Sequence, residues 1–305
     1  MACTAGSEGL MVSMAASQLT TNSTPEFSYS GFTDLVEQIQ NNTLGDIVII
    51  NNVSLANFTQ ISSERERRGL GFRLSLYMAD PGQLIVTIPT GAHEALHLFL
   101  NDSIRSMNVI MGVPRGELLS VGATTFTNLD DASGVRSRGE GDSCLRPRVR
   151  LPNGFPTVVI EAGYTQSWDS LRQKARWWFA ASNFDVKIVI LAKFDRYRGG
   201  RITIEKWKAV EAVLWPGVRT RAQANALAQA NALPQAACIQ SIHITRRALG
   251  NDPADPASYD VTAPLHLEFV DVYLRQPIEG QLEGDIVIDI AELQAYAVAF
   301  WLTNE

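Results

Sequence analysis

Pro156-Thr-Val-Val-Ile-Glu161 is the stretch of sequence from which the fold can be worked out. Its short apolar run with β-branched residues predicts a buried strand that ends in a carboxylate. Residues Ser167 to Ala181 have the pattern of an amphipathic helix, and Val186 to Phe194 predicts a second apolar strand. Two parallel strands need a connection of about a dozen residues or more, which this helix provides. The sequence therefore predicts a βαβ unit and an α/β fold.

Further elements are expected on both sides of this unit. A helix from about Ala92 to Met107 follows Thr90-Gly91 and has Glu94 in its first turn, and a final amphipathic helix follows the last strand. The alternating apolar pattern predicts the remaining strands at Asp46 to Val53, Gly71 to Met78, Gln83 to Ile88, Leu118 to Phe126, Arg201 to Lys208, Cys238 to Thr245, Leu265 to Leu274 and Ile286 to Ile290. We expect one mixed core sheet that begins with the strand at Asp46.

The domain organisation follows from length and composition. The chain has 305 residues, of which 46% are apolar, enough for one large globular domain over residues 25–305. Residues 1–24 lack the basic start and the apolar segment of a signal peptide, so we expect a disordered leader. A hexapeptide, Ala-Gln-Ala-Asn-Ala-Leu, occurs twice between Ala222 and Leu233. It predicts a low-complexity, partly helical surface insertion at about 219–237.

Cysteine content and hydropathy limit the protein's environment. Cys3, Cys144 and Cys238 show no CxxC spacing, so neither a disulfide framework nor a cysteine zinc site is expected. No apolar run reaches the roughly 20 residues that cross a bilayer. We therefore expect an intracellular protein, cytoplasmic or nuclear, without a membrane partner.

The charge distribution bears on nucleic-acid binding. A formal net charge of −6 argues against a protein that coats nucleic acid by charge alone. Between Gly134 and Trp178, however, eight basic residues face four acidic ones, a local excess of four positive charges. This excess could bind nucleic acid, or it could belong to a solvated, arginine-rich loop.

Three residues around the βαβ unit have the chemistry of a metal site. Asp142 precedes Glu161 by 19 positions, and Lys174 follows it by 13 positions on the predicted helix. Magnesium prefers oxygen ligands, and a bound ion can polarise a phosphoryl group and activate water. The two carboxylates and the lysine could therefore converge on one divalent ion, with Glu94 as a further carboxylate. Alternatively, the carboxylates cap strands or pair with nearby arginines.

The sequence resembles the PD-(D/E)XK restriction endonuclease-like superfamily in three patterns. They are Arg-Ser-Arg-Gly-Glu-Gly-Asp-Ser (136–143), Pro-Thr-Val-Val-Ile-Glu-Ala-Gly-Tyr (156–164) and Asp-Ser-Leu-Arg-Gln-Lys-Ala-Arg-Trp-Trp-Phe (169–179). The chain is most similar to an uncharacterised fungal group of that superfamily, and less closely to Uma2-type proteins. The resemblance extends from about Leu84 through the strand at Val186, and more weakly over 265–285. It implies a mixed central sheet flanked by helices and a nuclease that hydrolyses phosphodiester bonds of DNA or RNA.

The resemblance also assigns roles to single residues. It makes Asp142 the acidic residue of the first motif half, after Gly141 where proline often stands, and Glu161 that of the second half. Glu94 matches the acidic residue of the early helix. Together Glu94, Asp142 and Glu161 would hold Mg²⁺ or Mn²⁺, and the catalytic set would be Asp142, Glu161 and Lys174.

One position departs from the superfamily pattern. Glu161-Ala162-Gly163 has glycine where the lysine of the E-x-K motif should stand. Lys174 would be that lysine moved onto the following helix, and Gln166 is a candidate polar helper. The departure also leaves open a second class of function, a catalytically inactive nuclease-like binding or interaction protein.

A third class of function is suggested by a different motif. His93-Glu94-Ala95-Leu96-His97 matches H-E-x-x-H, the zinc peptidase helix in which two histidines bind metal and the glutamate is the base. Glu117, 20 positions beyond His97, could serve as a third ligand. The same segment also fits the early helix of the nuclease-like fold, and no HxxGxxH extension follows, so a zinc peptidase ranks third.

Overall fold

The computed structural model describes residues 24–42, 45–122, 124–128, 137–196, 200–211, 234–247 and 252–304. Residues 1–23 of the predicted leader and residues 219–233 of the predicted insertion lie outside the described residues. The end of that insertion is different from our expectation, because a strand already starts at Gln235. The described chain is a mixed α/β structure.

Both strands of the βαβ unit and most strands of the C-terminal half belong to a seven-stranded sheet. Its order is β13-β12-β11-β10-β9-β8-β5. The strands are β5 (Leu118–Ser120), β8 (Ser143–Pro147), β9 (Val158–Gly163), β10 (Ile188–Asp195), β11 (Arg201–Val210), β12 (Gln235–Arg246) and β13 (Tyr259–Val261). β9 and β10 are parallel, which confirms the predicted βαβ unit, and the other pairs are antiparallel. The sheet is therefore mixed.

The N-terminal strands belong to a second, six-stranded sheet of order β1-β2-β4-β3-β7-β6. The strands are β1 (Glu26–Ser28), β2 (Ile47–Asn51), β3 (Arg73–Met78), β4 (Gln83–Thr87), β6 (Thr125–Thr127) and β7 (Arg138–Glu140). The prediction of one core sheet beginning at Asp46 is thus wrong. Local apolar alternation identifies strands, but it carries no information about which distant strand supplies the partner.

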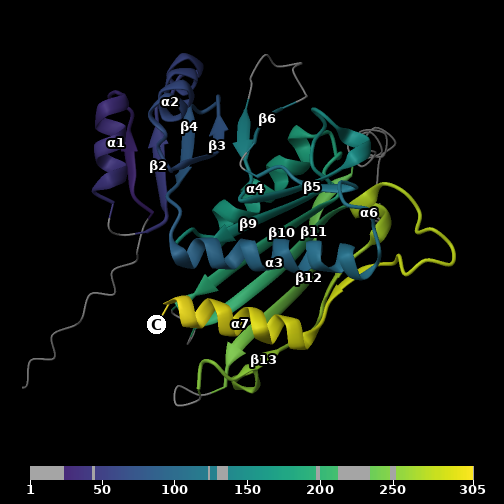
Figure 1. Ribbon diagram of the computed structural model, residues 1–305. Coiled ribbons are helices and arrows are strands. Elements are labelled where there is room, and N and C mark those ends of the chain that lie inside the picture. Colours follow the sequence, from purple (N-terminus) through teal and green to yellow (C-terminus); the bar gives the residue numbers. More distant parts are fainter. Residues whose placement is uncertain are drawn as a thin grey trace, which may run out of the picture.

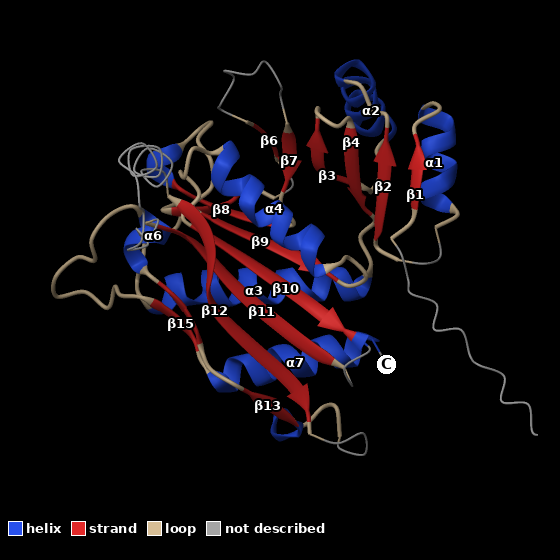
Figure 2. Cartoon of the chain, turned by 180° about the vertical axis from the view of Figure 1, so that it is seen from behind, coloured by secondary structure: helices blue, strands red, loops and turns tan. Residues whose placement is uncertain are grey.

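Helices cover both sheets. They are α1 (Phe32–Gln40), α2 (Leu55–Arg68), α3 (Gly91–Ile110), α4 (Trp168–Ala181), α6 (Phe269–Tyr273) and α7 (Ile290–Asn304), with short 3-10 turns at Arg148–Arg150 and Pro256–Ser258. In Figure 1, α3 and α7 lie side by side on one face of the seven-stranded sheet. Figure 2 shows α4 on the opposite face. The sheet is therefore the middle layer of three.

Alternate residues of the central strands build two separate cores. Ile160 and Ile190 face α3 and α7, whereas Val159 and Leu191 pack with Trp178 of α4. This division follows from the period of two along a strand, which sends successive side chains to opposite faces. The neighbouring Trp177 packs against the six-stranded sheet. Helix α4 consequently contacts both sheets.

The chain passes from one sheet to the other at Gly141–Asp142. β7 ends at Glu140 in the six-stranded sheet, and β8 begins at Ser143 in the seven-stranded sheet. There is no room for a larger residue at Gly141, because a Cβ atom there would lie 2.6 Å from Cys144 Sγ and 3.1 Å from Val159 Cγ1. This close crossing fixes the position of Asp142 between the two sheets.

Two of the predicted strands are shorter than expected. The segment Leu118 to Phe126 is divided into β5 and β6, which belong to different sheets. The segment Leu265 to Leu274 contains only β14 (Leu265–Leu267), which pairs with β15 (Ile286–Ile288), before helix α6 starts. Asp285 Oδ1 accepts a hydrogen bond of 2.8 Å from the backbone N–H of Phe269, at the start of this helix. Such a long-range helix cap is invisible to a local pattern.

In the described part of the chain, none of the helices combines the length and the apolar character needed to cross a membrane.

Candidate functional site

Glu161 lies in β9 with a fully buried carboxylate. Lys174 Nζ donates to Glu161 Oε2 at 2.5 Å, and Trp178 Nε1 donates to Oε1 at 2.6 Å. Both donors come from α4, four residues apart, so they lie on the same side of the helix. Burial raises the pKa of Glu161 to about 7, Lys174 opposes this rise, and the negative charge of Asp142 adds to it. Glu161 and Lys174 therefore form a buried ion pair.

Asp142 lies close enough to this pair to interact with it electrostatically. Its Oδ2 accepts a hydrogen bond of 2.8 Å from the backbone N–H of Ala162, the residue after Glu161. Burial opposes its ionisation, but the charges of His93 and Lys174 lower the pKa of Asp142 well below its usual value. Lys174 thus interacts electrostatically with both Glu161 and Asp142, and these two carboxylates keep its pKa above the usual value despite burial. The three residues predicted from the sequence lie in one charge cluster.

Glu94 is joined to this cluster through Arg73. The guanidinium of Arg73 donates from Nη1 to Asp142 Oδ1 at 3.0 Å and from Nη2 to Glu94 Oε1 at 2.8 Å. Glu94 Oε2 lies 3.3 Å from His97 Nε2, and His97 Nδ1 lies 2.9 Å from Ser143 Oγ. The side chain of Glu94 is 29% exposed, so this end of the cluster is accessible to solvent.

His93 connects Asp142 to a fourth carboxylate, Asp46. Its Nδ1 lies 2.8 Å from Asp46 Oδ2, and its Nε2 lies 3.1 Å from Asp142 Oδ1, within ion-pair distance. Asp46 also accepts from the backbone N–H groups of Tyr164 and Thr165, just after β9. Burial lowers the pKa of His93, but the two carboxylates outweigh it and raise the pKa to about 9.

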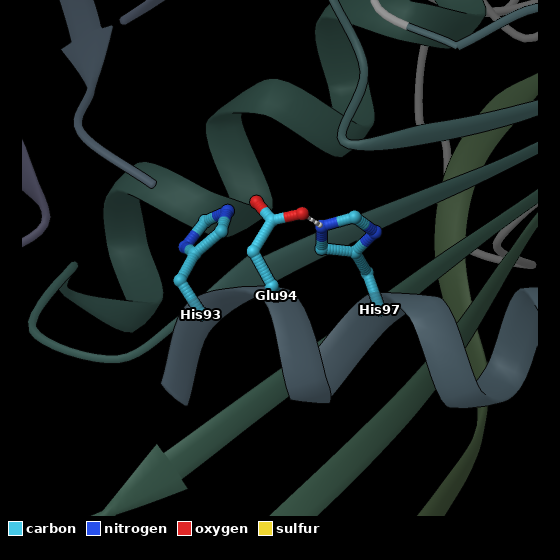
Figure 3. A group of neighbouring side chains, drawn as sticks. All are labelled: His93, Glu94 and His97. Atoms are coloured by element: carbon cyan, nitrogen blue, oxygen red, sulfur yellow. Dashed lines mark ion pairs between the residues drawn. The ribbon is translucent and has the colours of Figure 1, made fainter. Parts of the chain in front are cut away.

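His93, Glu94 and His97 also form a group that could hold a metal ion. Each offers one ligand atom, and the three atoms lie within 4.8 Å of one another. Figure 3 shows the three side chains on the same side of α3, with an ion pair between Glu94 and His97. Thr90 caps this helix, since its side chain accepts a hydrogen bond from the backbone N–H of His93. A metal ligated by His93 would first have to displace the proton held by the raised pKa.

The glycine that replaces the expected E-x-K lysine is explained by the packing of α4. A Cβ atom at Gly163 would lie 2.5 Å from Leu171 Cδ1 and 3.3 Å from its Cγ. Leu171 is fully buried and cannot easily move aside. A lysine at position 163 is therefore incompatible with this position of α4, and Lys174 of the same helix supplies the positive charge beside Glu161.

We predict that Gly163→Ala lowers the free energy of unfolding by about 1–3 kcal/mol, because the added methyl group overpacks the contact with Leu171. Urea denaturation of the purified proteins measures this. Gly284→Ala is the control, since a Cβ atom there meets no atom within 4 Å. Equal stability of the two variants would contradict this packing explanation.

The local basic excess is largely used for internal contacts. Arg150 pairs with Asp185, Arg172 with Glu205 and Lys174 with Glu161. Arg146 is buried and donates to the backbone oxygen of Pro152. Arg136 lies outside the described residues. The excess therefore does not translate into an equal number of free surface charges.

Gln166, the candidate polar helper, is buried in the loop between β9 and α4. Its Nε2 donates to Ser170 Oγ at 2.7 Å, and within the described part of the chain its buried Oε1 has no hydrogen-bond donor. Glu117, the candidate third zinc ligand, lies just before β5 and contacts Arg148 at 3.8 Å. The metal group around His93 does not include Glu117.

Two members of the cluster were missed by sequence reasoning, namely Arg73 and Asp46. Asp46 is the first residue of one predicted strand and Arg73 the third of another, and both are charged residues next to apolar runs, which was the available signal. Their partners in the structure lie 69 and 47 positions away in the chain.

No family model, no curated protein and no solved structure matches this chain.

Proposed function

We propose that the protein is a divalent-metal-dependent nuclease that hydrolyses phosphodiester bonds of nucleic acid. The observation that carries this proposal is the convergence of Asp142, Glu161 and Lys174, which come from the β7–β8 crossing, β9 and α4. The arrangement of β5-β8-β9-β10 between α3 and α4 supports it, because the resemblance to PD-(D/E)XK enzymes implies a mixed central sheet flanked by helices.

The donor types suit a hard divalent cation. Glu94, Asp142 and Glu161 offer carboxylate oxygens, which Mg²⁺ and Mn²⁺ prefer. Among the described residues, however, only His93, Glu94 and His97, and not these three carboxylates, already have ligand atoms within 4.8 Å of one another. Burial is the largest cause of the raised pKa of Glu161, and Lys174 opposes it only in part, so a further cation in contact with this carboxylate would favour its ionised form. Additional positive charge would therefore be stabilised here.

In this proposal the three carboxylates hold the ion, which when bound would polarise the scissile phosphoryl group and activate water. Lys174 favours the ionised form of Glu161 and orients its carboxylate, and Trp178 fixes the second oxygen of the same group. Glu94 is the most exposed of the three carboxylates, so the phosphate would approach from its side.

A second candidate is a nuclease-like protein that binds a partner without catalysis. The observation in its favour is that Asp142 and Glu161 are fully buried and already paired with Arg73, His93 and Lys174. The group of His93, Glu94 and His97 supports a zinc peptidase less well, because the raised pKa of His93 keeps that imidazole protonated near neutral pH.

The test compares wild type with the Asp142→Ala, Glu161→Ala double variant. Calorimetry with Mg²⁺ and Mn²⁺, followed by cleavage of mixed DNA and RNA in the same samples, should show that both binding and cleavage are lost in the variant. Circular dichroism establishes that the variant is folded, and Glu94→Gln, which removes a less buried charge, gives a second variant of lower folding risk.

Glu140→Gln is the matched control for this experiment. Glu140 is as buried as Glu161 and is held by Arg65 through hydrogen bonds of 2.7 and 2.8 Å, but it lies outside the proposed metal site. This variant should keep both metal binding and cleavage. Metal binding without cleavage of any nucleic acid would favour the second candidate, and metal analysis that finds stoichiometric zinc would favour the peptidase.

A further inference from the structure

The guanidinium of Arg73 lies between two of the three carboxylates that would bind the metal. Its Nη1 and Nη2 donate to Asp142 Oδ1 and to Glu94 Oε1, at 3.0 and 2.8 Å. A divalent ion that bridged the two side chains would likewise contact one oxygen of each carboxylate. Arg73 therefore stands in the position where a metal ion shared by Asp142 and Glu94 would be bound.

Two cations cannot share this position without strong repulsion. The guanidinium of Arg73 is always charged near neutral pH, and it forms ion pairs with both Asp142 and Glu94. The other oxygen of Asp142 accepts from the backbone N–H of Ala162, and Oδ1 also contacts His93. A metal ion can thus gain Asp142 Oδ1 only when Arg73 gives it up.

The structure also offers a place into which Arg73 could withdraw. Arg73 lines an open cavity of about 530 Å³ between α2 and the start of β3, together with Arg65, Glu66 and Thr125. Glu66 is exposed, and among the described residues its carboxylate takes part in no ion pair. A guanidinium turned into the cavity would have room and a new carboxylate within the same cavity.

We propose that Arg73 is a resident cation that holds Asp142 and Glu94 together while the metal is absent and that sets the affinity for the divalent ion by competing with it. This role rests on the proposed function, since it concerns the same carboxylates. Arg73 is a positioning residue here, because it acts through the carboxylates and not on the substrate.

The experiment measures Mn²⁺ and Mg²⁺ affinity by calorimetry for wild type, Arg73→Gln and Arg73→Lys. Removal of a positive charge a few ångströms from the ion should raise the Mn²⁺ affinity of Arg73→Gln by about tenfold or more. Arg73→Lys keeps the charge and should remain within about threefold of wild type by the same reasoning. The rise in melting temperature on adding Mn²⁺ should likewise be larger for Arg73→Gln.

Arg65→Gln is the control, because Arg65 lines the same cavity, is equally buried at 17% exposure and pairs with a buried glutamate outside the site. Its metal affinity should equal that of wild type. Unchanged or weaker Mn²⁺ binding by Arg73→Gln overturns the proposal, and so does an equal gain in Arg65→Gln.

If Arg73→Gln does not fold, crystals of wild type in saturating Mn²⁺ decide the question. Mn²⁺ on Asp142 and Glu94 with the guanidinium turned away supports the proposal, whereas Arg73 still bound to both carboxylates overturns it, with or without Mn²⁺. Tighter binding by Arg73→Gln without any cleavage of nucleic acid would sustain the role of Arg73 and refute the nuclease. Metal-dependent cleavage of nucleic acid by wild type, with no change in Mn²⁺ affinity in Arg73→Gln, would support the nuclease and refute the role of Arg73.

Discussion

Replacing Lys174 with methionine is expected to lower the free energy of unfolding by about 3–5 kcal/mol, the usual cost of removing one partner of a buried ion pair. Glu161 would keep a fully buried carboxylate without a cation, and Asp142 would lose part of the positive charge that keeps it ionised. Denaturant unfolding at pH 8 measures the effect. The double variant Lys174→Met, Glu161→Gln should recover much of the loss, since Trp178 can still donate to the amide oxygen.

The loss of stability caused by Lys174→Met should become smaller at lower pH. Burial already raises the pKa of Glu161 to about 7 with Lys174 in place, so without Lys174 the carboxyl group takes up a proton more readily. Lys206→Met is the control, because Lys206 is also buried but its partner Glu268 is 36% exposed and remains hydrated. The control should lose about 1 kcal/mol or less. An equal loss of stability in Lys174→Met and Lys206→Met would contradict the claim that Lys174 is needed to compensate a fully buried carboxylate.

The stability of the folded protein is expected to fall between about pH 6.5 and pH 9 because of His93. Its pKa in the folded state is about 9, above the ordinary value of 6.5, so the folded state binds the proton more tightly. The resulting stabilisation is complete below pH 6.5 and disappears as the pH rises through 9. The difference in pKa corresponds to at most about 3 kcal/mol.

Unfolding of wild type and His93→Gln at pH 7 and pH 9.5 measures this contribution. Wild type should lose about 2–3 kcal/mol more than the variant over this range, since Glu161, with a pKa of about 7, is present in both proteins. His266→Gln, at an exposed position of β14, should behave like wild type. If His93→Gln loses as much stability as wild type between pH 7 and pH 9.5, the pH dependence of stability does not come from the ion pairs of His93.

The elements that local patterns define were predictable, and the candidate site residues Glu161 and Lys174 stand on them. The strand ending at Glu161, the helix with Lys174 and the strand from Val186 appear at nearly the expected bounds, because each is a single run with its own period. Asp142 and Glu94 were proposed as carboxylate ligands and then matched by the resemblance, and both lie beside this unit. Their catalytic roles remain predictions.

The second sheet and the charged residues that it contributes to the site were not predictable. Arg73 and Asp46 join the cluster only because the six-stranded sheet packs next to β8 and β9, and no local pattern contains that contact. The helix at Leu55–Arg68 was missed for a related reason, since it is mostly polar and only Phe58 and Ile61 are buried. Its place is set by the sheet beneath it rather than by its own amphipathic pattern.

The crossing at Gly141–Asp142 has a consequence for the order of folding and for where the chain can be divided. The six-stranded sheet takes β6 and β7 from residues 125–140, after α3 and β5 have already left it. During synthesis, the edge of β3 that later pairs with β7 therefore stays open until the chain beyond Glu140 has been made. Such non-local pairing slows folding and leaves an edge on which another chain could add. A cut or a recombination breakpoint near Pro89 would thus separate two pieces of which the first lacks part of its own sheet.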